Sequence, residues 1–346
     1  MTATEAGQPA KDPEDGPDAT QVGDVAGYGW VDAGAIDAGL IDADPPDADH
    51  DLAGGSASDR IAALCARLMT PMPGDRLWGW IGPLLVTLFA AVLRFNRLSV
   101  PNAVIFDETY YAKDAWSILK HGVEWNWIGP PTVSSTYVNN QIIAGHFSEH
   151  LFKACSGTGC GEYVVQPEVG KLLIAVGEWM YGLTTLGWRF ASAVFGTLAI
   201  LLMCRVARRL TRSTLLGCTA GLLLSLDGLE FVLSRTGILD IFLMFFLLAS
   251  FGALIVDRDV SRARLAEAVV LRPGDEAGPG LGIRKWRVLA GIMLGLACAS
   301  KQYAIWYIFA FAALCVAWDL GARRTVGLRR SWRGALVRDG RWLPLT

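Results

Sequence analysis

The sequence of 346 residues is poor in charge, because Asp, Glu, Lys and Arg together make up only 18% of it. A soluble domain carries about 25% of these residues. Apolar residues reach 52%, and the mean hydropathy is +0.35. The start of the chain has neither the basic residues nor the continuous apolar run of a secretory signal peptide. These absences argue against an ordinary soluble enzyme and against a cleaved leader at this position.

The small net charge of −2 combines two regions of opposite sign. Residues 1–56 hold 13 acidic residues and one basic residue, whereas the remainder holds 30 basic and 20 acidic residues. The first region is rich in Asp, Ala, Gly and Pro, and it buries too little apolar area to offset the entropy of ordering. We therefore expect residues 1–60 to form a disordered acidic tail in the cytoplasm, without catalytic residues.

Apolar segments dominate the sequence from Leu77 onward. A helix needs roughly 20 residues to cross the core of a bilayer, and several of these segments reach that length with their flanks. This pattern predicts an all-α polytopic membrane protein whose core occupies residues 77–320. The apolar segments are 77–93, 169–186, 188–204, 214–233, 237–256, 286–300 and 303–319.

The distribution of Lys and Arg predicts the orientation, because basic loops stay in the cytoplasm. Three basic clusters, 205–212, 258–287 and 323–341, are expected inside. The long loop 95–168 and the turn 227–240 then lie outside the membrane. The basic cytoplasmic segment 321–346 is expected to be followed by further spans in a longer protein.

Segment 169–186 does not fit this alternation of spans. Counted as a full span, it would move the basic cluster after residue 204 to the outside. The segment is also interrupted by Gly177, Glu178 and Gly182. We predict a re-entrant or interface-lying helix, and a full span is the alternative.

Two cysteines lie in the predicted outer loop, Cys155 and Cys160. A pair outside the membrane can form a disulfide, which is our prediction, with two free thiols as the alternative. A metal pair is the rival interpretation, but neither a His nor a further Cys nearby has zinc-like spacing.

Several charged residues are expected at the outer face, although Lys and Arg generally gather on the cytoplasmic side. A charge at mid-bilayer costs roughly 2.5–3.5 kcal/mol, so those that persist mark function or a helix end. The basic members are Arg94, Arg97, Lys171, Arg189, Arg235 and Lys301. The acidic members are Asp107, Glu108, Asp114, Glu168, Asp227, Glu230 and Asp240. This combination predicts a site where cations hold an anionic lipid headgroup and a carboxylate acts on a molecule arriving from water.

The sharpest local pattern is VIFDETYYAKDAWSILKHG, residues 104–122. Its apolar spacing predicts an amphipathic helix that lies on the outer leaflet, with Asp107 at its N-terminus. The alternative is that Asp107 only caps this helix and Glu108 offsets the helix dipole.

Five motifs taken in order resemble the bacterial protein O-mannosyltransferases of the glycosyltransferase C superfamily, over roughly residues 77–320. They are FDETYYAKDAW, QPEVGKLLIAVGEW, WRFASAVFGTL, RVARRLTRSTLLG and LSRTGILDIFLMFF. The resemblance implies a helix bundle with a long first outer loop that carries amphipathic helices. It also implies that the chain is the N-terminal portion of a member.

The resemblance implies catalytic roles for Asp107 and Glu108, which match the family's Asp-Glu pair. The family's His-Pro-Pro-x-x-Lys element reads Gln166 to Lys171 here, so Gln replaces the His and Lys171 is retained. The later Arg-x-x-x-Leu-Asp element maps to Arg235 and Asp240.

The implied reaction transfers mannose, with inversion, from polyprenyl-phosphate mannose to Ser or Thr hydroxyls of secreted proteins. A hydroxyl needs a base as it attacks, and we assign Asp107 first and Glu108 second. The departing phosphate needs fixed positive charge. The candidates for it are Arg94, Lys171, Arg189 and Arg235, with Asp240 and Lys301 as supporting residues.

The sugar donor is a substrate, so no cofactor and no metal is predicted, although a divalent cation held by Asp107 and Asp240 is an open alternative. The expected partners are the donor lipid, the bilayer and secreted acceptor proteins delivered by the secretion machinery. The expected location is the cell membrane. One rival function is another lipid-phosphate-sugar transferase acting on a lipid or cell-wall glycan. A second is a non-enzymatic transporter or lipid-binding scaffold, which predicts charges along a central path.

Overall fold

A computed structural model describes residues 56–127, 136–147, 151–152, 161–162, 164–272, 274 and 278–338. The chain divides into two units, residues 1–48 and residues 49–346. The first unit and the predicted tail as far as residue 55 lie outside the described residues. The fold below is that of the second unit.

The second unit is built from helices. Four helical stretches in its described part are long and apolar enough to cross a membrane: α2 (Trp78–Phe95), α6 (Thr185–Thr211), α9 (Asp240–Leu271) and Gln302–Thr325. The last joins the short helix η3 (Gln302–Ala304) to α11 (Ile305–Thr325). At 1.5 Å per residue, the 18 residues of α2 extend about 27 Å, close to the thickness of a bilayer core. The predicted all-α, multi-pass membrane class is confirmed.

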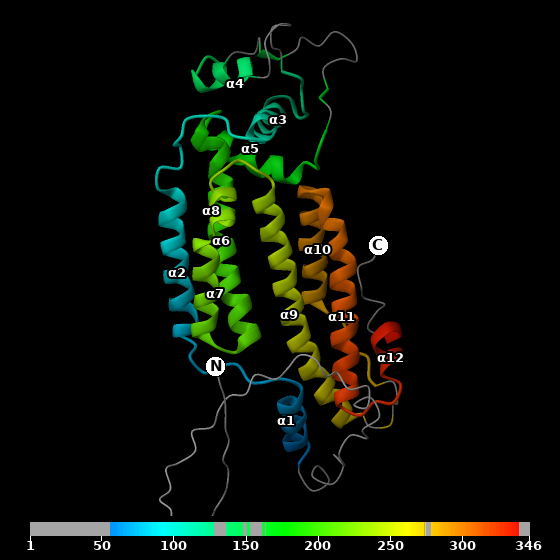
Figure 1. The fold of residues 1–346 in the computed structure, drawn as a ribbon. Coiled ribbons are helices and arrows are strands. Elements are labelled where there is room, and N and C mark those ends of the chain that lie inside the picture. The colour runs from blue at the N-terminus through cyan, green and yellow to red at the C-terminus, as the bar shows by residue number, and fades with distance from the viewer. Residues whose placement is uncertain are drawn as a thin grey trace, which may run out of the picture. The chain divides into compact units, whose positions relative to one another are not determined.

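The long helices run side by side in Figure 1, together with two shorter apolar helices, α7 (Thr214–Leu226) and α10 (Lys285–Ser300). Helix α6 packs on α2, α7 and α9, and α9 packs on α10. Small residues let these backbones approach closely. For example, a Cβ added at Gly221 of α7 would lie 2.1 Å from the Cys204 sulfur of α6.

Two predicted apolar segments are divided in the structure. Segment 169–186 forms α5 (Val169–Tyr181), a bend, and the first residues of α6. With 13 residues α5 extends about 20 Å, too short to cross a bilayer core, which favours the interface-lying prediction over the full span. Segment 214–233 forms α7 and the short helix α8 (Gly228–Leu233). The break comes at Asp227, whose carboxylate accepts a hydrogen bond from the Glu230 amide at 2.9 Å and caps α8.

The predicted end of the acidic tail is wrong by four residues. Residues 57–60 form the first turn of α1 (Ala57–Leu68). Ser56 and Asp59 make a capping box there, in which each side chain accepts from the backbone of the other residue. This capping box therefore starts α1 inside the segment that the composition predicts to be disordered.

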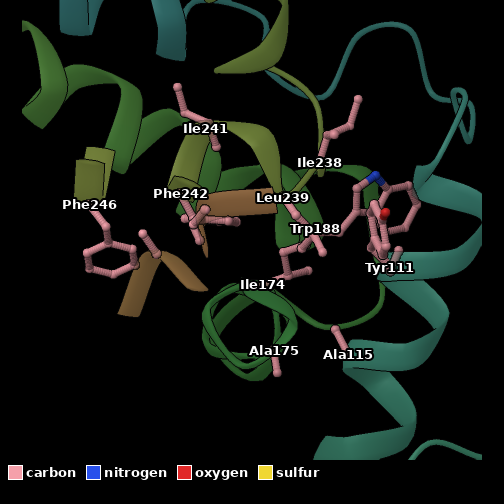
Figure 2. Close-up of a cluster of buried hydrophobic side chains, with 14 of the residues drawn as sticks. Tyr111, Ala115, Ile174, Ala175, Trp188, Ile238, Leu239, Ile241, Phe242 and Phe246 are labelled. Atoms are coloured by element: carbon pink, nitrogen blue, oxygen red, sulfur yellow. The ribbon is translucent and has the colours of Figure 1, made fainter. Parts of the chain in front are cut away.

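Three helices gather at one end of the bundle, which we call the loop end: α3 (Glu108–His121), α4 (Thr136–Ile143) and α5. Helix α1, α12 (Ser331–Arg333) and the π-helical turn η4 (Gly334–Arg338) lie at the opposite end (Figure 1). A buried apolar core joins the loop end to the bundle. Figure 2 shows Tyr111 of α3 against Trp188 of α6, with Ile174 of α5 and Leu239 beside them. This core fixes the position of α3, the helix that carries the Asp-Glu pair.

Candidate active site

Asp107 stands at the start of α3, and its carboxylate is half-buried. It occupies the N-cap position without making a capping hydrogen bond. Among the residues that the structure describes, none donates a hydrogen bond to this carboxylate. The Asp107 side chain therefore does not cap α3, and its carboxylate oxygens are available to accept a hydrogen bond from a substrate.

Glu108, the next residue, has the opposite environment, because it is fully buried. The Arg189 guanidinium donates to both of its carboxylate oxygens, at 2.7 and 2.9 Å. The backbone amides of Ile105 and Gly237 donate to the same carboxylate, each at 2.9 Å. Glu108 thus ties the first loop to α6 and to the segment before α9. A carboxylate with four donors and no exposure is an anchor rather than a base for a hydroxyl from solvent.

Arg189 is fully engaged by these contacts. Besides Glu108, its guanidinium donates to the carbonyl oxygens of Pro101 and Ala103, at 3.1 and 2.9 Å, and the side chain is 1% exposed. It therefore braces the loop from residue 98 to residue 108. The structure gives Arg189 a partner other than the predicted lipid phosphate.

Arg94 of α2 is likewise buried and paired. Its guanidinium contacts the carboxylate of Glu230 in α8, and it also donates to the Ala90 carbonyl at 3.1 Å. Lys171 of α5 is fully buried between Glu124 and Asp114, with 3.3 Å from its Nζ to an Asp114 oxygen. Each of these cations is paired with a buried carboxylate, and its binding of the lipid phosphate stays a prediction.

Arg235 is the predicted phosphate-binding cation that keeps an accessible guanidinium. It is half-buried, and its guanidinium donates to the backbone carbonyls of Leu93, at 2.6 Å, and Arg97, at 3.2 Å. Burial, and then the nearby guanidinium groups of Arg189 and Arg94, lower the pKa of Arg235. No described carboxylate pairs with Arg235, so its charge is open to an anion.

Arg97 adds a second accessible cation beside Arg235. It is exposed, and its backbone adopts a positive φ of 55° in the turn that follows α2. The sequence placed Arg97 among the outer charges but did not select it. Its proximity to Arg235 follows from the way α2 ends beside the loop before α9.

Asp240 and Lys301 form an ion pair of 2.7 Å between the start of α9 and the end of α10. Their side chains are 34% and 17% exposed. Lys301 is thus the described ion-pair partner of the Asp240 carboxylate. Close by, the side-chain oxygen of Gln166 accepts from the amide of Gln302 at 3.4 Å. The Gln at the family's His position thus contacts the segment next to Lys301.

Tyr111 lies where the first loop and α9 meet, one turn after Asp107 and on the same face of α3. Its side chain is 5% exposed (Figure 2). Burial, followed by the negative charges of Asp107, Asp240 and Asp114, raises the pKa of Tyr111 to about 12. The fold therefore brings Asp107 and Asp240, which are far apart in sequence, into the surroundings of one neutral phenol.

Two other predictions concern the loop end. Cys155 and Cys160 lie outside the described residues, so the disulfide stays a prediction. Among the described side chains, no group of three or more His, Cys, Asp or Glu residues is arranged to hold a metal ion. The expectation that the protein needs no cofactor and no metal stays a prediction.

The sequence analysis placed Glu230 and Asp114 among the outer-face acids without pairing them to the buried cations, and it missed Glu124. Glu124 and Glu230 are 5% and 3% exposed, and each pairs with a cation from a different helix. Glu124 follows the 104–122 helix without any recognisable motif. The available signal was the position of each cation among apolar residues, because a buried charge needs a partner of opposite sign.

Comparison with known proteins shows what this part of the chain is similar to. A family profile described as dolichyl-phosphate-mannose-protein mannosyltransferase matches residues 167–337. Over these residues the chain is similar to this protein mannosyltransferase family. The predicted resemblance, which rested on motifs spread from residue 106 to residue 246, is confirmed.

The relatives include actinobacterial enzymes. The polyprenol-phosphate-mannose–protein mannosyltransferase of Mycobacterium tuberculosis is 42% identical over 275 residues, which are 77% of this chain and 46% of that protein. The Corynebacterium glutamicum protein of the same name is 38% identical over 261 residues, 74% of this chain and 45% of that protein. The chain thus spans about half the length of these relatives.

A solved structure shares the fold. The Saccharomyces cerevisiae protein O-mannosyltransferase Pmt1–Pmt2 complex, bound to the sugar donor, matches with a TM-score of 0.52 at 18% identity. The match covers 82% of this chain and 33% of that one. This likeness confirms the predicted helix-bundle fold.

Proposed function

We propose that the protein transfers mannose, with inversion, from polyprenyl-phosphate mannose to Ser or Thr hydroxyls of secreted proteins. The observation that carries the proposal is the contrast within the Asp-Glu pair. No described residue donates a hydrogen bond to the Asp107 carboxylate, while Glu108 is buried among four donors. The actinobacterial relatives carry the same activity in their names.

Asp107 is the base in this proposal. It accepts the proton of the acceptor hydroxyl as the hydroxyl oxygen attacks the anomeric carbon from the face opposite the lipid phosphate. Glu108 holds the backbone on either side of Asp107 through Arg189 and the Ile105 amide. In this proposal Asp107 therefore reacts, and Glu108 fixes the position of Asp107.

Arg235 and Arg97 bind the lipid phosphate in this proposal. Both are accessible cations near the loop end, and a phosphate oxygen that gains charge as the sugar leaves is stabilised by guanidinium donors. Arg189 and Arg94 lie close enough to lower the pKa of Arg235, so they add positive potential without contacting the phosphate. A phosphate is already a good leaving group, so an acid is not required.

The loop end faces the outside of the cell membrane in this proposal, and the acidic tail lies in the cytoplasm. The cluster of Arg205, Arg208, Arg209 and Arg212 at the end of α6 remote from the loop end supports this orientation. Acceptors then reach Asp107 from water as the secretion machinery delivers them, while the donor arrives within the bilayer.

The test is a transfer assay in membranes that contain the protein. Polyprenyl-phosphate mannose with radiolabelled sugar is supplied with a Ser- and Thr-containing peptide, and the label is followed into peptide, lipid and glycan. We expect label in the peptide, released by an α-mannosidase if the donor is β-linked. Label that enters only lipid or glycan would identify the rival transferase, and no transfer to any acceptor would reject the enzymatic proposal.

A further inference from the structure

Phe106, the residue before the proposed base, has an unusual backbone conformation. Its φ is 50°, in the left-handed region that bulky residues rarely adopt. The Glu108 amide donates to the Ile105 carbonyl at 3.0 Å and closes a tight turn. Phe106 and Asp107 are the two central residues of this turn, and the φ of Asp107 is −70°. A turn with a positive and then a negative φ usually has Gly, Asn or Asp at its first central position, where Phe106 stands.

The aromatic ring of Phe106 is left outside the core of the fold. The residue is 78% exposed, more than any other large apolar residue in the described part of the chain. A positive φ and an apolar ring in water are both unfavourable, and burial within the described residues offsets neither. Strain of this kind gathers at sites that bind another molecule, so the ring is a candidate contact for a ligand.

The turn that carries Phe106 is held firmly by its neighbours. The buried Glu108 carboxylate accepts from the Ile105 amide on the other side of the turn. It also accepts from Arg189 of α6 and from the Gly237 amide before α9. These contacts fix the backbone before and after Phe106, so the ring is kept beside the Asp107 carboxylate.

The bilayer is a poor partner for this ring, because another helix provides the apolar surface at the loop end. Helix α5 has a row of apolar residues at helical spacing, each 45% to 73% exposed, which are Leu172, Val176, Trp179 and Met180. Helix α3 packs on the buried side of α5, where Asp114 contacts Lys171. Only Tyr110 and Lys120 of α3 are exposed. A ring among acyl chains would also bring the neighbouring Asp107 toward the bilayer core, which is costly for a charge.

The position next to Asp107 points instead to the acceptor. Consecutive Cα atoms lie about 3.8 Å apart, so a molecule whose hydroxyl meets the Asp107 carboxylate brings its neighbouring groups to the Phe106 ring. A Phe ring has no hydrogen-bonding group, and it therefore suits an apolar side chain better than a sugar rich in hydroxyls. In an extended peptide, side chains two residues apart lie on the same side of the backbone.

We propose that the Phe106 ring binds an apolar side chain of the acceptor polypeptide, two residues from the Ser or Thr that receives the sugar. Phe106 then selects among hydroxyls according to their neighbours, while Asp107 carries out the proton transfer. The identity of this polypeptide as the mannose acceptor rests on the proposed function. The binding of an apolar peptide side chain at Phe106 does not.

Two dye-labelled peptides test the proposal in the full protein, reconstituted in lipid discs. One carries Val two residues before and two residues after its Thr, and the other carries Asn at both positions. Fluorescence anisotropy without donor gives the affinity, and the transfer assay gives the acceptor KM. We expect the wild type to prefer the Val peptide about tenfold in both measurements, as burial of one apolar side chain predicts.

Phe106→Asn removes the ring and keeps a residue that tolerates a positive φ. It should treat both peptides alike within about twofold, and Phe106→Trp should retain the preference. The unfolding temperature of Phe106→Asn should equal or exceed that of the wild type, because the strain is relieved while little packing is lost. Val123→Ala is the matched control, since Val123 is a 55% exposed apolar residue just after α3. It should behave as the wild type.

An unchanged peptide preference in Phe106→Asn would overturn the proposal. A change confined to the donor KM would place the ring on the sugar, and a lowered unfolding temperature would make it part of the fold. Extra quenching of Phe106→Trp by brominated acyl chains, relative to the wild type, would place the ring in the bilayer. Each of these results rejects the acceptor contact.

The two measurements also separate this inference from the proposed function. If the anisotropy preference depends on Phe106 but mannose enters only lipid or glycan, the proposed function fails and the peptide contact stands. If mannose enters both peptides equally well in the wild type, the peptide contact fails and the proposed function stands.

Discussion

The two ends of the bundle treat buried charge differently. At the end opposite the loops, Arg284 and Arg287 each contact both Asp257 and Asp319, at distances from 2.5 to 3.2 Å. All four residues are at most 7% exposed, and none of their fully buried polar side-chain atoms lacks a hydrogen-bond partner. At the loop end, by contrast, unpartnered oxygens remain on Asp114, Glu124, Glu178 and Glu230.

This difference separates structural charge from charge that can respond to a ligand or a proton. The network at the opposite end joins α9, α10 and α11, and its donors and acceptors balance. At the loop end, cations pair with carboxylates that still have unpartnered oxygens. Asp107 and Arg235 also retain hydrogen-bonding capacity that no described ion pair uses. A site that must exchange protons and bind a phosphate needs such unfilled capacity. Four predictions test the comparison, from the largest effect to the smallest.

The largest effect is expected for Asp107→Asn. Loss of the base that accepts the hydroxyl proton should reduce the rate of mannose transfer by about 10²- to 10⁴-fold. Thermal stability should hardly change, because Asp107 makes no capping hydrogen bond. Initial rates with labelled donor measure the effect, with Glu168→Gln as control. Transfer within a few-fold of wild type would remove Asp107 from the role of base.

At the opposite end, Asp319→Asn should cost about 3–5 kcal/mol in the free energy of unfolding, because it leaves buried guanidinium groups without a full partner. Transfer per folded molecule should stay unchanged. Equilibrium unfolding in mixed micelles measures the cost, and Glu267→Gln, an exposed residue of α9, is the control. A stability equal to the control would mean that the network does not hold these helices together.

The third prediction concerns the lipid phosphate. Removal of a charge-assisted hydrogen bond by Arg235→Met should raise the donor KM about 10- to 100-fold, since such bonds contribute about 1.5–3 kcal/mol. Arg235→Lys should recover part of the loss by restoring the charge without the planar fork. Arg76→Met, an exposed residue near the opposite end, is the control. An unchanged donor KM would exclude Arg235 from phosphate binding.

The smallest effect is expected for the partly exposed pair of Asp240 and Lys301. An ion pair of this exposure contributes about 1 kcal/mol or less to stability. The two single variants, Asp240→Asn and Lys301→Met, and their combination form a double-mutant cycle, read by unfolding and by transfer rate. A coupling energy well above this value, or a large loss of transfer, would place the pair inside the reacting site.

The sequence by itself determined the class of this protein. Long apolar segments require helices in a membrane because backbone groups there must pair internally, and the order of the motifs from FDETYYAKDAW to LSRTGILDIFLMFF identified the family. The outer-face charges were found in the same way, since a charge is costly in apolar surroundings wherever it occurs along the chain.

Only the tertiary structure decided which of those charges are open. Arg94, Lys171 and Arg189 look like Arg235 in the sequence, yet each is buried against a carboxylate, while Arg235 contacts backbone carbonyls. The neighbours Asp107 and Glu108 likewise differ in the fold. Asp107 caps no described amide at the start of α3, whereas Glu108 accepts hydrogen bonds from Arg189. Pairing depends on contacts between residues far apart in the chain, and local patterns carry no information about those contacts.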